Sequence, residues 1–345
     1  EANKNSKLLV RYSFKNQSAK PKDIEIYLLI RPYQVNPYYQ FLNTIGGVGK
    51  INEIKEIDQK TIGVDNKIIY SQQNHALFTA STFDEGNIVD FIRDNSLTYN
   101  KQAFDPAGLA NGVVRYNLHI NPNDETQILL TIPFHEHSGT FSNNEIKEIE
   151  IGFNTSANFW KNEINHVKFN LPESANRIVK AYRANLAYIL INRDKTGIQP
   201  GSRSYDRSWI RDGALTSSAL LKSGIVKEVK EFIDWYSLHI FENGKVPCVV
   251  DFRGPDPVPE NDSHGEYIYL IKEYFNFTKD TAFLRDKNRQ ILKVVEYIES
   301  LIAQRSTDYY KNGNDSIRSL YGLVPESISH EGYSAKPMHS YWDNF

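Results

Sequence analysis

The stretch of sequence that decides the fold is Ser204-Tyr205-Asp206-Arg207-Ser208-Trp209-Ile210-Arg211-Asp212-Gly213-Ala214. It places two Arg-Asp pairs around a tryptophan, at a point where the pattern predicts that a loop turns into a helix. Arginine supplies a planar fork of donors, aspartate supplies acceptors, and tryptophan supplies a flat apolar face. Together these groups can bind the hydroxyls and the C–H face of a sugar ring. The alternative interpretation is a buried ion-pair cluster that caps the helix, although such clusters add little stability.

Upstream of Pro172 the sequence has the pattern of β-strands. Several segments alternate polar with apolar residues, are rich in β-branched and aromatic side chains, and are separated by short turn sequences. Strands are predicted over Lys7–Phe14, Asp23–Ile30, Val113–Ile120, Gln127–Ile132 and Lys147–Phe153. Short strands at this spacing predict a large antiparallel sandwich.

Downstream of Pro172 the apolar period becomes helical. A stripe of apolar residues recurs at helical spacing from Ile178 to Leu190, and Pro172 and Glu173 suit a helix N-terminus. Further helices are predicted over Ala214–Leu221, Val226–Phe241, Glu266–Phe275 and Thr281–Gln304. This part is therefore expected to be all-α, with the boundary between the two parts near Leu171.

Composition narrows the classes of partner and cofactor. The 345-residue chain carries a net charge of −2 without a basic run, which disfavours nucleic acid or an anionic membrane surface and suits a neutral substrate. No apolar run approaches the length of about 20 residues that a membrane helix needs. The single cysteine, Cys248, lies in an apolar run and is interpreted as a buried thiol.

No cofactor or metal is predicted. The chain has no glycine-rich phosphate loop, and His135-Glu136-His137 offers two imidazoles without a third ligand. The chain opens without a methionine and ends in the aromatic segment Ser340–Phe345, so it is expected to be a piece of a longer protein.

A second polar cluster is Glu260-Asn261-Asp262-Ser263-His264-Gly265-Glu266, which precedes a predicted helix. Asp262 or Ser263 with Glu266 would make a capping box. That interpretation leaves Glu260, Asp262 and His264 unexplained, and loops at the ends of helices often carry binding sites.

A third cluster contains Glu326 and Glu331, followed by Tyr341, Trp342 and Asp343. A glycosidase needs one carboxylic acid that stays protonated to donate to the leaving oxygen, and a carboxylate opposite it. Aromatic walls raise the pKa of a nearby acid and so help it to keep its proton. The alternative is a solvent-exposed acidic turn, which describes Glu326 better than Glu331.

With Trp209-Ile210-Arg211-Asp212 in view, the order of parts resembles the glucoamylase-like, six-hairpin glycoside hydrolases and their disaccharide-phosphorylase relatives. Members carry an N-terminal β-sandwich, a linker and an (α/α)6 barrel whose first loop bears a Trp-x-Arg-Asp motif. The resemblance implies a sandwich over residues 1–160, a linker over 161–172 and about half of a toroid over 173–345. A second polypeptide is one way in which such a barrel would be completed.

The resemblance also implies roles for individual residues. Arg211 and Asp212 match the family's sugar-binding pair, Trp209 matches its tryptophan, and Glu331 is the best positional match to its general acid, with Glu326 as the second candidate. The general base would lie beyond Phe345. The expected function is an inverting, exo-acting glycoside hydrolase on a neutral oligosaccharide or polysaccharide. Asp206, Arg207, Glu260, Asp262, His264, Tyr341, Trp342 and Asp343 are the further expected substrate-binding residues. The alternatives are a disaccharide phosphorylase and a catalytically silent carbohydrate-binding protein.

Overall fold

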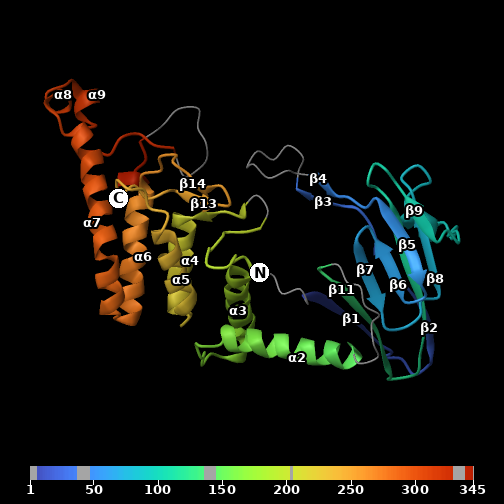
Figure 1. The fold of residues 1–345 in the computed structure, drawn as a ribbon. Coiled ribbons are helices and arrows are strands. Elements are labelled where there is room, and N and C mark those ends of the chain that lie inside the picture. The colour runs from blue at the N-terminus through green and yellow to red at the C-terminus, as the bar shows by residue number, and fades with distance from the viewer. Residues whose placement is uncertain (1–5, 37–46, 136–144, 203–204, 329–338, 345) are drawn as a thin grey trace. The chain divides into compact units, whose positions relative to one another are not determined.

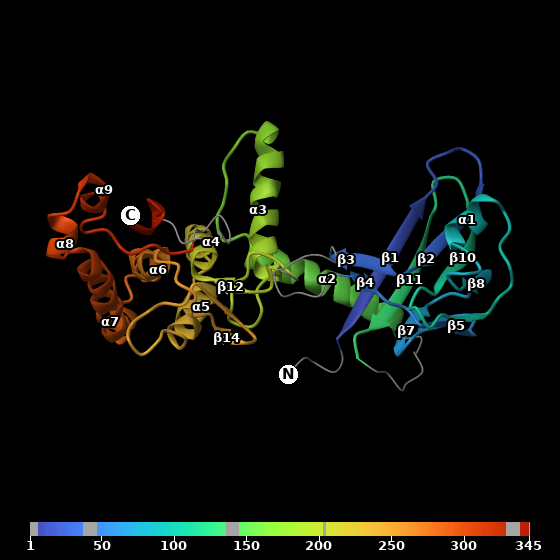
Figure 2. The same ribbon diagram turned by 90° about the horizontal axis from the view of Figure 1, so that it is seen from above.

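A computed structural model describes residues 6–36, 47–135, 145–202, 205–328 and 339–344. The chain divides into two compact units, the first ending at Phe159 and the second beginning at Trp160. The first is built from antiparallel sheets and is called the β unit here; the second is mainly helical and is called the helical unit (Figures 1 and 2). The protein thus has a mixed β + α architecture.

The β unit contains two antiparallel sheets. The larger has the order β1 (Lys7–Lys15), β11 (Glu125–Pro133), β7 (Lys67–Ser71), β6 (Thr61–Val64), β5 (Glu53–Asp58) and β9 (Gln102–Phe104). The smaller has the order β2 (Lys22–Ile30), β10 (Asn111–Ile120) and β8 (Leu77–Ser81). A separate hairpin joins β3 (Tyr33–Asn36) to β4 (Gly47–Gly49), and the short helix α1 (Ile88–Arg93) follows β8.

The two sheets share one hydrophobic core, as a sandwich requires. Strand β10 shows how the sequence encodes it: Tyr116, Leu118 and Ile120 are buried, whereas the alternate residues Asn117 and His119 are exposed. The core joins these side chains to residues of the larger sheet such as Ile54 and Ile128. The short turn between β10 and β11 carries the chain from one sheet to the other.

One predicted strand is wrong. Residues 147–153 belong to the helix α2 (Glu145–Glu163), most of which is part of the β unit. The segment alternates over a few residues, but apolar residues also recur at Ile146, Ile149 and Phe153, which is helical spacing. Lys147, Glu148 and Glu150 lie among them, and lysine and glutamate are depleted in strands and favourable in helices.

The helical unit begins at Trp160 in the last turn of α2, and its next element is a short 3₁₀ turn, η1 (Glu173–Ala175). Its long helices are α3 (Asn176–Ile191), α4 (Ile210–Lys222), α5 (Lys227–Ser237), α6 (Asp262–Thr278) and α7 (Thr281–Arg305). The short helices α8 (Asp308–Lys311) and α9 (Asp315–Arg318) and the 3₁₀ turn η3 (Trp342–Asn344) complete it. None of the helices described here is both long and apolar enough to cross a membrane.

Helices α4 and α6 lie side by side and run in the same direction (Figure 1). Near their N-terminal ends Arg211 contacts Asp262, and further along Ser218 Oγ lies 3.3 Å from Glu273 Oε2. Helix α5 lies between them in the chain and packs against both, while α7 packs against α6. Two parallel neighbours with a return helix between them bring both N-termini to one end of the unit.

The contact between α4 and α5 depends on a glycine. A Cβ built on Gly213 would lie 2.3 Å from the ring of Phe232, a fully buried side chain of α5. No side chain fits at this position unless the ring moves, so Gly213 permits the close approach of the two helices.

We predict that Gly213→Ala lowers the free energy of unfolding by about 1–3 kcal/mol, because an added methyl group overpacks the site. The matched control is Gly265→Ala, also within a helix, where an added Cβ meets nothing within 4 Å. It should stabilise the protein by up to about 1 kcal/mol through helix propensity. Urea denaturation of both variants measures the difference, and equal midpoints would contradict the packing argument.

Candidate functional site

A small sheet fixes the entry to α4. Strand β12 (Ser208–Trp209) pairs with β13 (Val249–Asp251), which pairs with β14 (Gly254–Pro255). The amide of Ile210 continues this pairing by donating to the carbonyl of Cys248 at 3.0 Å. The loop before α4 is therefore held by its backbone, so that Arg211 and Asp212 stand in the first turn of the helix. Cys248 itself is buried, which raises the pKa of its thiol to about 12 and fits the predicted inert role.

Arg211 joins the first two predicted clusters. Its guanidinium forms an ion pair with Asp262, the first residue of α6, and its Nη1 lies 3.3 Å from Glu260 Oε2. Burial by itself lowers the pKa of this group, but the charges of Asp262, Glu260 and Asp212 more than offset this and raise it. Arg211 therefore remains a cation, and it links the first turn of α4 to the start of α6.

Trp342 brings the third cluster to the same point. Its indole Nε1 donates to Asp262 Oδ2 at 2.8 Å, so that one carboxylate accepts from both Arg211 and Trp342. The Trp342 side chain is 42% exposed, which leaves part of its apolar face open to solvent. Residues from all three predicted clusters thus meet at Asp262.

Carboxylates outnumber cations in this group. Burial raises the pKa of Asp212, although Arg211 partly opposes the shift. Burial also raises the pKa of Glu260 to about 7, against the pull of Arg211 and with a contribution from Asp262. Glu266, one turn along α6 from Asp262, has its pKa raised to about 7 chiefly by burial and then by Asp262. Near neutral pH, Glu260 and Glu266 are therefore each protonated for part of the time.

The sequence analysis missed the position of Glu266. The predicted capping box is absent: α6 begins after Asn261, and no side chain caps its N-terminus. Within the part of the chain that the structure describes, the buried Oε2 atom of Glu266 has no hydrogen-bond partner. The signal that was available is the spacing of four between Asp262 and Glu266, which places both carboxylates on one face of a helix.

The other predicted Arg-Asp pair, Asp206 and Arg207, has different contacts from those of Arg211 and Asp212. Arg207 is buried and forms ion pairs with Asp251, at 2.8 Å, and with Asp256, at 3.4 Å. Its guanidinium carbon lies 5.2 Å from the centre of the Trp209 ring. Asp206 is exposed on the loop before β12. For Arg207 the structure therefore favours the ion-pair interpretation, with its charge supporting the β13–β14 loop and the Trp209 ring.

His264 lies in the core of the helical unit. It is 1% exposed, its Nδ1 accepts from the backbone N–H of Val246 at 3.2 Å, and its ring packs edge-on against Tyr297. Burial lowers the pKa of His264 to about 4, so that the ring is neutral. These contacts suit a structural residue better than the sugar-binding role predicted for it.

The remaining candidates lie around the end of the chain. Glu326 lies within ion-pair distance of Arg305 and His339, and its pKa is lowered by a backbone hydrogen bond and then by its interactions with Arg305 and His339. Asp343 accepts a hydrogen bond from Ser327 Oγ, and Tyr341 is 94% exposed. Glu331 lies outside the described residues. Among the described residues, no group of three or more His, Cys, Asp or Glu side chains is arranged to hold a metal ion.

Comparison with known proteins gives structural likenesses only. No family model and no curated protein matches the sequence. A bacterial glucoamylase complexed with acarbose is similar in structure, with 15% identity, a TM-score of 0.49, and coverage of 84% of this chain and 51% of that one. A protein from the human microbiome described as a kojibiose phosphorylase has 11% identity, a TM-score of 0.39, and coverage of 86% and 41%.

A rhamnosidase from Klebsiella oxytoca with rhamnose bound has 10% identity, a TM-score of 0.34, and coverage of 92% of this chain and 63% of that one. This chain therefore spans between 41% and 63% of the length of those three proteins. The resemblance read from Trp209-Ile210-Arg211-Asp212 named glucoamylases and phosphorylases, and both kinds of protein are among these matches. Identities of 10–15% say nothing of substrate or catalytic residues.

The charge excess predicts a pH dependence of stability. The pKa of Glu260 is about 7 in the folded chain against an ordinary value of 4.5, so the folded state holds a proton that the unfolded state lacks between these values. The free energy of unfolding should therefore fall as pH rises from 4.5 to 7. Glu260→Gln should remove part of this fall and stabilise the protein above pH 7 by on the order of 1–3 kcal/mol.

Urea denaturation between pH 5 and 7.5 measures this slope. Glu326→Gln is the control, because the pKa of Glu326 is lowered from its ordinary value of 4.5, so that removing this carboxyl should not reduce the fall in stability between pH 5 and 7.5. An identical slope in the wild type and Glu260→Gln would show that the carboxyl of Glu260 titrates normally.

Proposed function

We propose that the cluster around Arg211 binds the terminal pyranose of a neutral oligosaccharide, and that the protein is an inverting, exo-acting glycoside hydrolase. One observation carries the proposal: Arg211 in the first turn of α4, Asp262 at the start of α6 and Trp342 of η3 form one hydrogen-bonded group at the N-termini of α4 and α6. A guanidinium, carboxylates and an indole face in one place are the groups that bind ring hydroxyls and the C–H face of a sugar.

Each residue of the cluster has a different role in this proposal, which follows from its contacts. Asp262 already accepts from Arg211 and Trp342, so in this proposal it orients both of them rather than serving as the main acceptor for the substrate. Asp212 is half-buried in the first turn of α4 and would accept from a sugar hydroxyl. The part-exposed ring of Trp342 would form an apolar wall.

The proton donor in this proposal is Glu331, for which the support is its place in the order of the chain, in the third cluster between Glu326 and Trp342. Glu326 is a poorer candidate, since Arg305 and His339 hold its carboxyl ionised. A general acid must instead keep its proton near the working pH.

We further propose that α3–α7 belong to an (α/α)6 toroid. The parallel pair α4 and α6, with α5 returning between them, is the arrangement of inner and outer helices in such a ring. Helix α3 exposes Ile178, Tyr188 and Ile191, and α7 exposes Leu292 and Val295. Apolar side chains exposed on both the first and the last long helix fit a ring in which further helices cover them.

The decisive experiment is a screen of aryl glycosides and neutral oligosaccharides with the full-length protein, in buffers with and without phosphate. Release of free sugar with inversion at the anomeric carbon supports the hydrolase. Phosphate-dependent release of sugar 1-phosphate identifies a phosphorylase instead. Sugar binding in calorimetry without any product after long incubation identifies a catalytically silent binding protein.

We predict that Asp212→Asn lowers kcat/KM about 100-fold or more, because the proposed hydroxyl contact tightens in the transition state. The matched control is Asp286→Asn, an exposed aspartate on α7 that lies beside Lys287 and should leave kcat/KM within about threefold, as surface substitutions usually do. Steady-state kinetics measure both variants. Equal kcat/KM in the two variants would remove Asp212 from the proposed site.

A second pair of variants assigns the proton donor. Glu331→Gln should lower kcat by about 100-fold or more while the Kd for the sugar stays nearly unchanged, as expected on loss of a general acid. Glu326→Gln should retain most of the activity. If Glu326→Gln is the inactive variant and Glu331→Gln is not, the proton donor is Glu326.

A further inference from the structure

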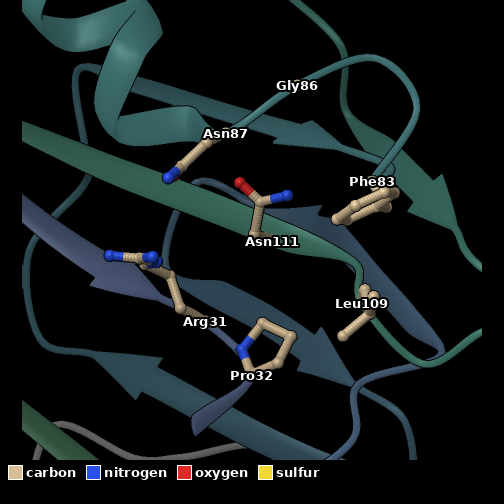
Figure 3. Close-up of a pocket in the computed structure, with 7 residues that line it drawn as sticks. All are labelled: Arg31, Pro32, Phe83, Gly86, Asn87, Leu109 and Asn111. Carbon is tan, nitrogen blue, oxygen red and sulfur yellow. The ribbon is translucent and has the colours of Figure 1, made fainter.

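The β unit contains a pocket that is far along the chain from Arg211. A pocket of about 230 Å³ is lined by Arg31, Pro32, Phe83, Gly86, Asn87, Leu109 and Asn111. Figure 3 shows Arg31 and Asn87 on one side of it, Phe83 and Leu109 on the other, and Asn111 between them. For scale, a dry cavity of about 150 Å³ binds benzene, so the space suits one ring-sized ligand.

The walls of this pocket are fixed by hydrogen bonds. Asn111 is buried, with its Oδ1 accepting from Ile88 N at 2.8 Å and its Nδ2 donating to Ser81 O at 3.1 Å. The backbone N–H of Phe83 donates to the buried carboxylate of Asp105 at 2.7 Å. The pocket is therefore largely preformed, as small-molecule sites usually are.

The loop between Phe83 and Asn87 turns at Gly86, which has a φ of +121°. An added Cβ at Gly86 would also lie 3.1 Å from the ring of Phe91, so that only glycine allows this course of the chain. The turn places the ring of Phe83, which is 66% exposed, at the edge of the pocket.

The side chains of Arg31 and Asn87 offer donors to the pocket. The side-chain oxygen of Asn87 accepts from Val89 N, which leaves its NH₂ group to face a ligand. Among the described residues, the guanidinium of Arg31 has no hydrogen bond or ion pair. A ligand for this pocket should thus carry several acceptor oxygens next to an apolar face.

We infer that this pocket binds one pyranose unit of a neutral saccharide, with a C–H face on Phe83 and hydroxyl oxygens accepting from Arg31 and Asn87. The exposed carboxylates of Asp84 and Glu85 follow Phe83 directly in the chain and disfavour an acidic sugar. Pro32 and Leu109 add apolar surface. None of these residues belongs to the helical unit, so the inference stands apart from the proposed function.

The test uses saturation-transfer NMR and titration of maltotriose, cellotriose, xylotriose and trigalacturonate against the full chain. The background is Asp212→Asn, which disables the site proposed in the helical unit. At least one neutral trisaccharide should still bind, and Phe83→Ala should weaken that binding by about tenfold or more. Arg31→Ala should weaken it as well.

The matched control is Phe104→Ala, since Phe104 is a phenylalanine of the β unit with the same 66% exposure but does not line the pocket. It should leave the affinity within about twofold. The inference is overturned if no neutral trisaccharide binds the Asp212→Asn chain, if Phe83→Ala and Phe104→Ala behave alike, or if trigalacturonate binds best. Binding that is lost in Asp212→Asn but unchanged in Phe83→Ala also overturns it, while leaving the site of the helical unit intact.

Discussion

The ion pair between Arg211 and Asp262 is the constraint on which the candidate site depends. It joins the first turns of two parallel helices, and the same carboxylate accepts the indole N–H of Trp342. A buried charge is costly unless it is paired and hydrogen-bonded. Removal of either partner would therefore leave the other charge buried and unpaired. The pair therefore fixes the ends of α4 and α6 relative to each other. It also fixes the place where the loop after α7 returns to them.

Crowding of carboxylates follows from this arrangement. Helix N-termini favour negative charge, and both α4 and α6 carry an aspartate in the first turn. Glu260 and Glu266 add two more carboxylates around a single guanidinium, and burial raises the pKa of each to about 7. Stability alone does not explain such an excess of buried acids, because like charges in a low dielectric oppose folding. Clusters of acids with raised pKa values are typical of functional sites, where a carboxyl group that gains and loses a proton near neutral pH is useful.

The two Arg-Asp pairs of the opening stretch show why a motif is not yet a site. Both have the same chemistry in sequence, yet Arg207 is buried with Asp251 and Asp256 while Arg211 faces the acids of α6. The two arginines differ in their place in the secondary structure. Arg211 is in the first turn of α4, whereas Arg207 directly precedes strand β12. The pocket of the β unit could not be predicted from a motif either. It is lined by Arg31, Phe83 and Asn111, which no sequence pattern connects.

Periodicity alone determined much of the architecture. The alternation in β10 and the apolar stripes of α3–α7 mark these elements, because burial on one face imposes a period that is visible in the residues themselves. The same local signal failed at residues 147–153, where a short run of alternating residues also fits a helix and the contacts of the chain selected α2. The motif Trp209–Asp212 and the acids of residues 260–266 were visible as candidates. Which carboxylates face Arg211, why His264 is buried, and how Trp342 reaches Asp262 were decided only by tertiary structure, because ion pairs and desolvation depend on distances between residues that lie 18 to 80 positions apart.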